Sequence, residues 1–331
     1  MNRGVILVNI GSPDAPTAPA VRRYLCRFLS DPRILGLPAV VRMPLVYGLI
    51  APLRASHSAR AYAKIWTDAG SPLNVHGHAL ARAVGGVYAT RYGKPSIDDA
   101  LDQLEGVDEI VVFPLYPQYA AATTASTLDA VGAAFAGRAR VPAIRMVPPF
   151  WHHAGFLDAV ADAARPLIEA VKPDKVLFSY HGLPESQVRA ACDQGLAEGC
   201  CDRQGIPLFC YRAQCLATTR LLAPRLGVHE FLTTFQSRVG PGQWIGPATL
   251  DTLVQLARGG TKRVVVLTPS FVADCLETLE EIAHGAREAF VGAGGEVLVV
   301  APCVNTHPRW VAAVKELVTL GPAATEHHHS R

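Results

Sequence analysis

The 331-residue sequence predicts an α/β fold made of two similar doubly wound domains, each built on a parallel sheet. Short apolar runs recur along the chain, and the gaps between them are long enough for helices. The runs are rich in Val, Ile, Leu and aromatic residues and end in Gly, Pro, Ser or Asn, which is typical of buried parallel strands. The eight runs span 5–11, 87–93, 109–117, 142–150, 175–182, 230–238, 263–271 and 296–304.

The spacing of these runs predicts the domain organisation. Four runs precede residue 151 and four follow it, so we expect an N-terminal α/β domain over 1–150 and a C-terminal one over 151–331. Ligands of such sheets bind beyond the carboxyl ends of the strands and between domains, so the active site is expected in the cleft between the two. The last helix closes the second domain or, alternatively, packs back on the first.

The composition narrows the class of protein. Half of the residues are hydrophobic and 18% are charged, which suits a large core. A net charge of +3 without a long basic run gives no electrostatic case for nucleic acid. No G-x-G-x-x-G follows the first run and no G-x-x-x-x-G-K-[ST] occurs, so a nucleotide cofactor is not supported. The N-terminus lacks the features of a secretory signal, which favours a cytoplasmic protein.

One apolar stretch, ILGLPAVVRMPLVYGLIAPL at 34–53, is long enough to cross a membrane. Arg42 in its middle and three prolines along it argue against a membrane-spanning helix. Two interpretations remain. The stretch is either a buried helical hairpin or an apolar lip that receives a flat hydrophobic ligand or makes peripheral contact with a membrane.

A histidine and a row of carboxylates follow two of the predicted strands. His181, in SYHGLPES, could act as a general base because the pKa of histidine lies near working pH, but it could equally be a turn residue bonded to backbone. Asp274, Glu277 and Glu281 recur at helical spacing and share one face. The first two could form a capping box, whereas Glu281 extends the row by a turn, which suits passage of a divalent cation such as Fe²⁺.

Two further segments carry residues that could bind a ligand. FPLYPQYAAATTAST contains Tyr116 and Tyr119, and FQSRVGPGQWIGPAT contains Ser237, Arg238 and Trp244 around a Gly-Pro-Gly turn. Arginine binds carboxylates and tryptophan offers a flat apolar surface, although each segment could equally be loop structure.

The cysteines are concentrated in one segment. Five of the eight fall between residues 191 and 215. In a reducing cytoplasm such a density argues for metal or redox chemistry more than for disulfides. The clustered cysteines are Cys192, Cys200, Cys201, Cys210 and Cys215.

Together these motifs resemble those of ferrochelatases, which insert Fe²⁺ into a porphyrin in haem synthesis. The resemblance runs nearly end to end, and the His181 and Glu277 segments in this order are its most specific part. It implies the two-domain chelatase fold, with His181 and Glu277 as paired active-site residues and 34–53 as the lip that holds the porphyrin. The matching segments are LVNIGSPDAP, RRYLCRFLSDPR, IWTDAGSPL, FPLYPQYAAATTAST, SYHGLPES, FQSRVGPGQW, PSFVADCLETLEEI and APCVNTHP.

The resemblance also implies roles for single residues. His181 is expected to accept protons, and Glu277, with Asp274 and Glu281, to take part in metal or proton transfer, with Fe²⁺ meeting all four side chains. Ile10 stands where ferrochelatases acting on coproporphyrin tend to have tyrosine, which favours protoporphyrin IX as the substrate. The expected porphyrin-binding residues are Ile10, Tyr116, Ser237, Arg238 and Trp244.

The cysteine-rich segment 192–215 is similar to an insertion found in a bacterial subgroup, in which four cysteines hold a [2Fe–2S] cluster. We expect the ligands to be Cys192, Cys200, Cys201 and Cys210, and Cys215 remains an alternative for one of them. A Cys₄ zinc site is the other interpretation. A cluster here is expected to support the fold or sense redox state and not to act in metal insertion.

Two alternative functions stay open. Within the enzyme class, the chain could be a coproporphyrin III ferrochelatase or a chelatase for another metal, such as cobalt, and a related tetrapyrrole. From a different class, it could be a non-catalytic porphyrin- or haem-binding protein that uses its cluster as a sensor. The joint presence of His181 and the carboxylate row argues against this second alternative. The sequence does not indicate an oligomeric state.

Overall fold

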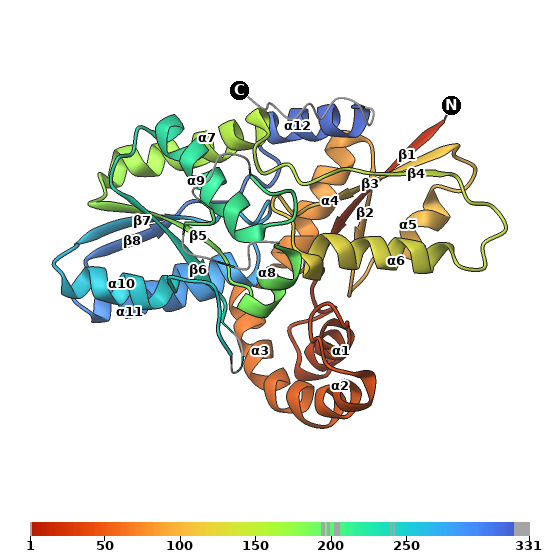
Figure 1. The fold of residues 1–331 in the computed structure, drawn as a ribbon, viewed down its shortest axis with the longest axis horizontal. Coiled ribbons are helices and arrows are strands. Elements are labelled where there is room, and N and C mark those ends of the chain that lie inside the picture. Colours follow the sequence, from red (N-terminus) through yellow and green to blue (C-terminus); the bar gives the residue numbers. More distant parts are fainter. Residues whose placement is uncertain are drawn as a thin grey trace. The chain divides into compact units, whose positions relative to one another are not determined.

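The chain contains two four-stranded parallel sheets with helices on their faces, which confirms the predicted α/β fold with two similar domains (Figure 1). The computed structural model describes residues 2–192, 196, 199–201, 206–238, 240 and 242–320. Grouped by their contacts, the residues form two compact units. The first comprises the chain up to Leu115, Ala121–Pro148 and Ala273–Glu280, and the second comprises Tyr116–Ala120, Pro149–Val272 and the chain from Glu281 onward.

Each predicted apolar run coincides with one strand, and the two sheets share one topology. The strand order is β2-β1-β3-β4 in the first sheet and β6-β5-β7-β8 in the second, so the second sheet repeats the connectivity of the first. The strands are β1 (Arg3–Asn9), β2 (Val87–Thr90), β3 (Glu109–Pro114), β4 (Ala143–Met146), β5 (Lys175–His181), β6 (Phe231–Gln236), β7 (Arg263–Leu267) and β8 (Val297–Val300).

Helices cover the first sheet on both sides. The helix α4 (Pro72–Val84) contacts β1 and β2. The helices α5 (Ile97–Gln103) and α6 (Ser126–Phe135), the latter preceded by η2 (Ala121–Ala125), pack on the other face, where Leu101 and Val131 join Val112 in one buried cluster. Burial on both faces explains why these strands are continuously apolar.

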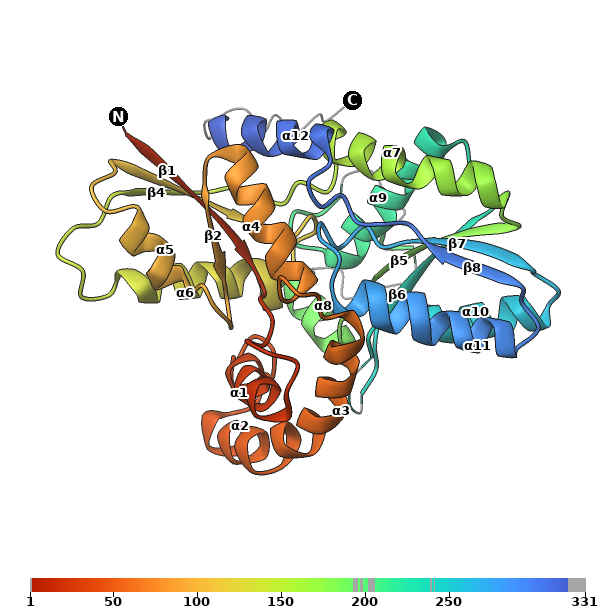
Figure 2. The same ribbon diagram turned by 180° about the vertical axis from the view of Figure 1, so that it is seen from behind.

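The second sheet is covered in the same way. The helices α10 (Thr249–Arg258), η3 (Glu277–Ala286) and α11 (Arg287–Gly292) share a buried cluster with β5, β7 and β8, centred on Leu253 and Phe290. The helix α7 (Ala154–Val171) contacts β7, and α9 (Tyr211–Leu226) contacts β6. The final helix α12 (Pro308–Thr319) packs on α7 through Trp310 (Figure 2). The short α8 (Glu185–Ala191) follows β5.

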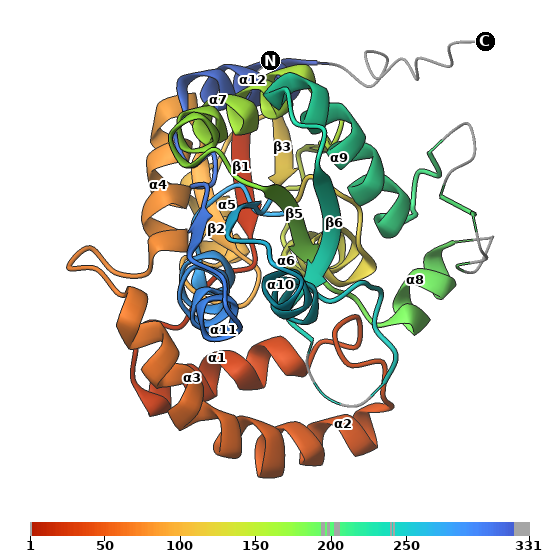
Figure 3. The same ribbon diagram turned by 90° about the vertical axis from the view of Figure 1, so that its left-hand side faces the viewer.

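Between β1 and β2 the first unit carries a group of helices (Figure 3). These are α1 (Ala18–Leu29), α2 (Ala39–Leu45), η1 (Val46–Ile50) and α3 (Ala51–Ile65). The predicted stretch 34–53 is an exposed apolar lip and not a buried hairpin, because Val40 is 82% exposed and Leu53 is 72% exposed. Arg42 is buried, and its guanidinium donates to the carbonyl oxygens of Leu35 and Leu37. Among the described residues, no helix is both long enough and apolar enough to cross a bilayer.

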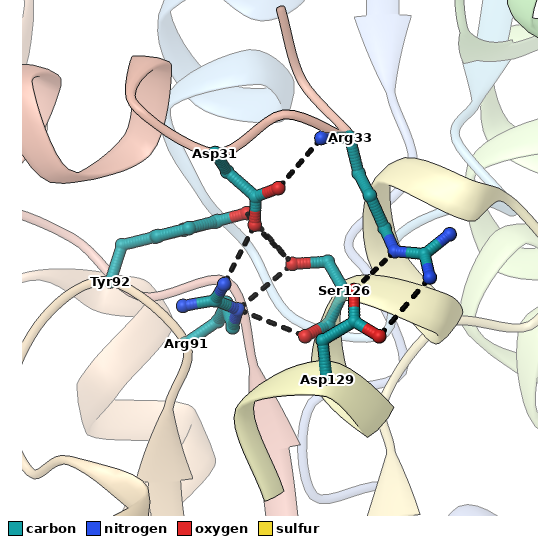
Figure 4. Close-up of polar contacts among 6 residues, drawn as sticks. All are labelled: Asp31, Arg33, Arg91, Tyr92, Ser126 and Asp129. Carbon is teal, nitrogen blue, oxygen red and sulfur yellow. Dashed lines mark hydrogen bonds and ion pairs between the residues drawn. The ribbon is translucent and has the colours of Figure 1, made fainter. Parts of the chain in front are cut away.

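A buried carboxylate fixes the root of the lip (Figure 4). Asp31 accepts hydrogen bonds from Arg91 Nη2 at 2.7 Å, from the Tyr92 hydroxyl at 2.8 Å and from the Ser126 hydroxyl at 2.6 Å. The carbonyl of Asp31 accepts from the amides of the first two lip residues, Ile34 and Leu35. These contacts, which we call the Asp31 anchor, join the lip to the end of β2 and the start of α6.

The anchor also sets the charge of Asp31. Burial raises the pKa of this carboxyl, but the hydrogen bonds from Ser126, the Arg33 amide and Tyr92, together with the charge of Arg91, outweigh it. The net pKa therefore lies below the ordinary value of 3.8. A lowered pKa in the folded state stabilises the fold above the ordinary value, and this contribution is lost as pH falls through the folded-state pKa.

We predict that Asp31→Asn lowers the free energy of unfolding by about 3 kcal/mol at neutral pH, because Arg91 loses its buried partner. The difference from the unmodified protein should shrink as pH falls below 3.8. Urea unfolding at a series of pH values measures both effects. The exposed Asp98→Asn is the matched control and should change stability by less than about 1 kcal/mol. Equal stability of Asp31→Asn and the unmodified protein at neutral pH would contradict the anchor.

Candidate active site

His181 is the last residue of β5, where the sheet register holds it opposite Gln236 of β6. Its backbone amide donates to the Ser270 hydroxyl at 3.0 Å, and its carbonyl accepts from the Tyr211 hydroxyl at 2.8 Å. The ring nitrogen Nδ1 lies 2.6 Å from the Gly182 carbonyl oxygen. A carbonyl can only accept, so Nδ1 carries the proton and the lone pair of the neutral imidazole is on Nε2.

The turn after His181 leaves no room for a side chain. A Cβ on Gly182 would lie 2.6 Å from the Gln236 carbonyl oxygen, which accepts from the Gly182 amide at 2.7 Å. The turn is also tied to the loop after β6, since the Ile245 amide donates to the Leu183 carbonyl and the neighbouring Trp244 pairs with Pro184. His181 and Trp244, predicted from separate motifs, therefore belong to one region of the second unit.

Glu281 supports the same loop. Its carboxylate accepts from the Ser237 amide at 2.7 Å and from the Ser237 hydroxyl at 2.5 Å. Ser237 has a φ of +63°, a left-handed conformation that is costly for a non-glycine residue and needs such support. Arg238 is largely exposed, with one guanidinium nitrogen 3.9 Å from Asp251. Both carboxylate oxygens of Glu281 thus accept hydrogen bonds from Ser237. Helical spacing alone did not predict this contact.

Asp274 and Glu277 belong to the first unit, in a segment that packs on α1 and α3. Glu277 begins η3, a π-helical segment of the kind that is frequent at functional sites. Burial is the main cause of the raised pKa of the Tyr62 hydroxyl, and the nearby charge of Glu277 adds to it. Burial lowers the pKa of His76, while Asp274 partly opposes this shift.

Tyr62 and His76 are the residues near the carboxylates that the sequence did not single out. Tyr62 is one of several apolar positions at helical spacing in α3, and His76 is one of two histidines in α4. Neither lies in a motif, so no local signal could have identified them. Lys64, on the same helix as Tyr62, pairs with Glu280 at 2.8 Å on the exposed side.

The remaining porphyrin-binding predictions lie at the ends of first-sheet strands. Ile10 follows β1, is half-buried, and its carbonyl accepts from the Tyr92 amide. Tyr116 follows β3 and is half-buried, in the short segment Tyr116–Ala120 that belongs to the second unit. In that segment Gln118 contacts Thr218 and the Tyr119 amide donates to Gln214.

Four of the five clustered cysteines share one buried group with Ala213: Cys192, Cys200, Cys201 and Cys210. The Sγ atoms of Cys200 and Cys201 are 3.6 Å apart, close to the roughly 3.8 Å between two thiolates that bind one tetrahedral metal at about 2.3 Å. Arg212 donates to Cys201 Sγ at 3.4 Å. The pKa of Cys201 is lowered to about 6, first by a hydrogen bond from Cys210 against the opposing effect of burial, and further by Cys200 and Arg212.

Cys215 differs from these four. It is fully buried in α9, and burial is the main cause of its raised pKa. Tyr211 hydrogen-bonds to it and partly opposes this rise. Across the described part of the chain, no set of three or more His, Cys, Asp or Glu side chains is arranged to hold a metal ion. The cysteine group therefore has the donor types that a cluster needs but is not a formed metal site.

The comparison with known proteins decides the family. The family model described as Ferrochelatase matches residues 2–320. The chain belongs to the ferrochelatase family. These enzymes are lyases that insert ferrous iron into a porphyrin, so the predicted enzyme class is confirmed. The non-catalytic sensor is not supported.

Relatives confirm the family along nearly the whole chain. The ferrochelatase of Legionella pneumophila is 40% identical over 329 residues, covering 96% of this chain and 99% of the relative. That of Aromatoleum aromaticum is 43% identical over 332 residues, covering 95% and 86%. Among solved structures, SirB from Bacillus subtilis with Fe³⁺ superposes with a TM-score of 0.55 at 11% identity, covering 96% of this chain and 95% of SirB. At this identity the likeness shows the chelatase fold alone.

We predict that Glu281→Gln lowers the free energy of unfolding by about 2 kcal/mol, because an NH₂ donor replaces one of the two carboxylate oxygens that accept from Ser237. A double-mutant cycle with Ser237→Ala in urea unfolding should give a coupling energy of about 1 kcal/mol or more. The neighbouring Glu280→Gln removes only the exposed pair with Lys64 and serves as the control, with an expected cost below about 1 kcal/mol. Additive effects of the first two changes would exclude the proposed support of the loop.

Proposed function

We propose that this ferrochelatase-family chain inserts Fe²⁺ into protoporphyrin IX to form haem, with His181 as the proton acceptor. Insertion must remove two protons from pyrrole nitrogens, which requires a neutral base at the macrocycle. The observation that carries the proposal is the hydrogen bond from Nδ1 of His181 to the Gly182 carbonyl, because it supports a basic Nε2. Trp244 in the same region offers a flat apolar surface for the macrocycle.

The carboxylates are proposed to serve the metal or the released protons. Asp274 shortly precedes η3 and Glu277 begins it, and oxygen ligands suit a labile divalent iron. Glu281 is proposed to act with Asp274 and Glu277, although its hydrogen bonds to Ser237 favour a positioning role. Binding that favours a puckered macrocycle would expose a nitrogen lone pair and so lower the barrier. The placing of the site in a cleft between the domains stays a prediction.

The proposal of protoporphyrin IX over coproporphyrin III rests on Ile10. An apolar, half-buried side chain at this position favours the vinyl groups of protoporphyrin over the charged propionates that replace them in coproporphyrin. Ser237, Arg238 and Tyr116 are proposed as further porphyrin contacts. A coproporphyrin III ferrochelatase is the second candidate. The exposed lip is proposed to hold one edge of the porphyrin and to touch a membrane surface, in a protein of the cytoplasm.

The cysteine group is proposed to hold a [2Fe–2S] cluster through Cys192, Cys200, Cys201 and Cys210. The fit of these residues is supported by their shared burial, by the 3.6 Å separation of two Sγ atoms and by the positive charge of Arg212. The separate contact of Cys215 with Tyr211 argues against it as a ligand. When bound, such a cluster would supply an oxidation-sensitive cross-link within the 192–210 segment, which ends directly before α9. A Cys₄ zinc site remains the alternative for the same residues.

We predict that His181→Ala lowers kcat for Fe²⁺ insertion by about a hundredfold or more, with porphyrin binding little changed. Glu277→Gln should also lower kcat. An anaerobic insertion assay measures turnover, and quenching of tryptophan fluorescence measures porphyrin binding. His229→Ala and Glu288→Gln, at exposed sites in the second unit, are the controls and should retain activity. Normal turnover by His181→Ala would exclude its role as the proton acceptor.

For the cysteines, we predict that Cys210→Ser removes the visible absorbance of anaerobically purified protein together with its bound iron and sulfide. Cys215→Ser should keep both, because that thiol lies outside the buried group. Full colour in Cys210→Ser, or loss of colour in Cys215→Ser alone, would show that the ligand assignment is wrong. Bound zinc without sulfide would instead identify the alternative site.

A further inference from the structure

A groove opens between α1 on one side and η1 and the first turns of α3 on the other, so the C-terminal end of the lip forms part of its wall. Its volume is about 690 Å³. The lining residues that matter here are Arg22, Arg23 and Arg27 of α1, with Tyr47, Pro52 and Ser56 opposite them. Neither His181 nor the carboxylate row takes part in this lining, so the groove is distinct from the proposed catalytic residues.

The charge around this groove is strongly one-sided. Residues 18–64 contain seven arginines and one lysine but a single carboxylate, Asp31, whereas the whole chain is nearly balanced at 31 basic and 28 acidic residues. Asp31 is buried in its anchor and does not offset the groove. Three of the basic residues are likewise engaged elsewhere, since Arg33 pairs with Asp129, Lys64 pairs with Glu280 and Arg42 is buried, so the positive charge at the groove comes from the arginines that line it. The three arginines of α1 therefore give the groove a positive local potential, which favours an anion.

The arginines of the groove are available to a ligand. Across the described residues, Arg22 and Arg27 make no side-chain hydrogen bond or ion pair, and both are exposed. Arg23 lies 3.7 Å from Asp14, but both side chains are at least half exposed, so this pair is weak. The guanidinium fork matches the oxygens of a phosphate group, which makes phosphate the best-fitting anion.

The neighbouring surface is apolar. Val40, Leu49 and Leu53 of the lip are each more than half exposed, and Tyr47 both lines the groove and is 47% exposed. A small, soluble phosphate compound would leave these apolar side chains exposed to water. A basic groove bordered by exposed aliphatic and aromatic side chains is the pattern of a helix that lies in the interface of an anionic membrane.

We propose that this groove binds the phosphate headgroups of anionic phospholipids while the lip inserts its apolar side chains into the membrane surface. This deepens the proposed function by naming the lipid class that the lip meets. It also rests on that function, because a hydrophobic substrate would then pass between the membrane and the lip.

The test is binding of the full-length protein to vesicles of phosphatidylcholine alone and to vesicles that also contain phosphatidylglycerol, measured by co-sedimentation. The unmodified protein should prefer the anionic vesicles, and salt should weaken this preference. Each basic residue near an anionic surface contributes about fivefold to binding, so the triple variant Arg22→Gln, Arg23→Gln, Arg27→Gln should bind about a hundredfold more weakly. The control variant Arg258→Gln, Arg287→Gln, Lys315→Gln removes the same charge from exposed positions of the second unit and should bind normally.

An equal loss in the two triple variants would overturn the proposal, since net charge alone would then explain binding. Tight binding of free glycerol 3-phosphate without any preference for anionic vesicles would assign the groove to a soluble ligand and also overturn it. Fe²⁺ insertion with detergent-dispersed porphyrin, in the absence of vesicles, should be the same for the unmodified protein and for both triple variants. Normal insertion without vesicle preference refutes the lipid site alone, and vesicle preference without insertion refutes the proposed function alone.

Discussion

The proposed chemistry depends on one short hydrogen bond, from Nδ1 of His181 to the carbonyl of Gly182 at 2.6 Å. It places the lone pair of the imidazole on Nε2, where it can accept a proton. The bond exists because the chain turns sharply after β5, and the turn requires Gly182, whose missing Cβ would meet the Gln236 carbonyl at 2.6 Å. That carbonyl is fixed by the pairing of β5 with β6. The pairing of β5 with β6 thus requires glycine at position 182, and the turn at Gly182 in turn sets the tautomer of His181.

The sequence alone predicted the sheets because central parallel strands are buried on both faces and read as continuous apolar runs. It could not decide whether 34–53 is buried, because apolar side chains on a short helix look alike in a core and on a lip. Nor did it place Ala273–Glu280 with the first unit. That grouping comes from Leu276 and Leu279, which pack against Val21 and Tyr62 far away in the chain.

Position after a strand and helical spacing made His181 and the carboxylate row candidates for the site, and the resemblance to ferrochelatases supplied their expected roles. The supporting contacts were not predictable, because they join residues far apart in sequence. Ser237 and Glu281 are 44 positions apart, and Asp31 meets Ser126 across 95 positions. The local pattern of apolar and polar residues does not indicate such pairs. Cys215 is the one clustered cysteine inside α9, whereas Cys210 directly precedes this helix, and Cys215 is not part of the buried group that the other four form.

Fe²⁺ insertion into protoporphyrin IX is tested most directly by an anaerobic assay that offers protoporphyrin IX and coproporphyrin III separately. We predict haem formation from Fe²⁺ and protoporphyrin IX, with a higher kcat/KM for protoporphyrin IX than for coproporphyrin III. A preference for coproporphyrin III would contradict the significance of Ile10. Turnover of neither, by protein that still binds porphyrin, would contradict the account as a whole.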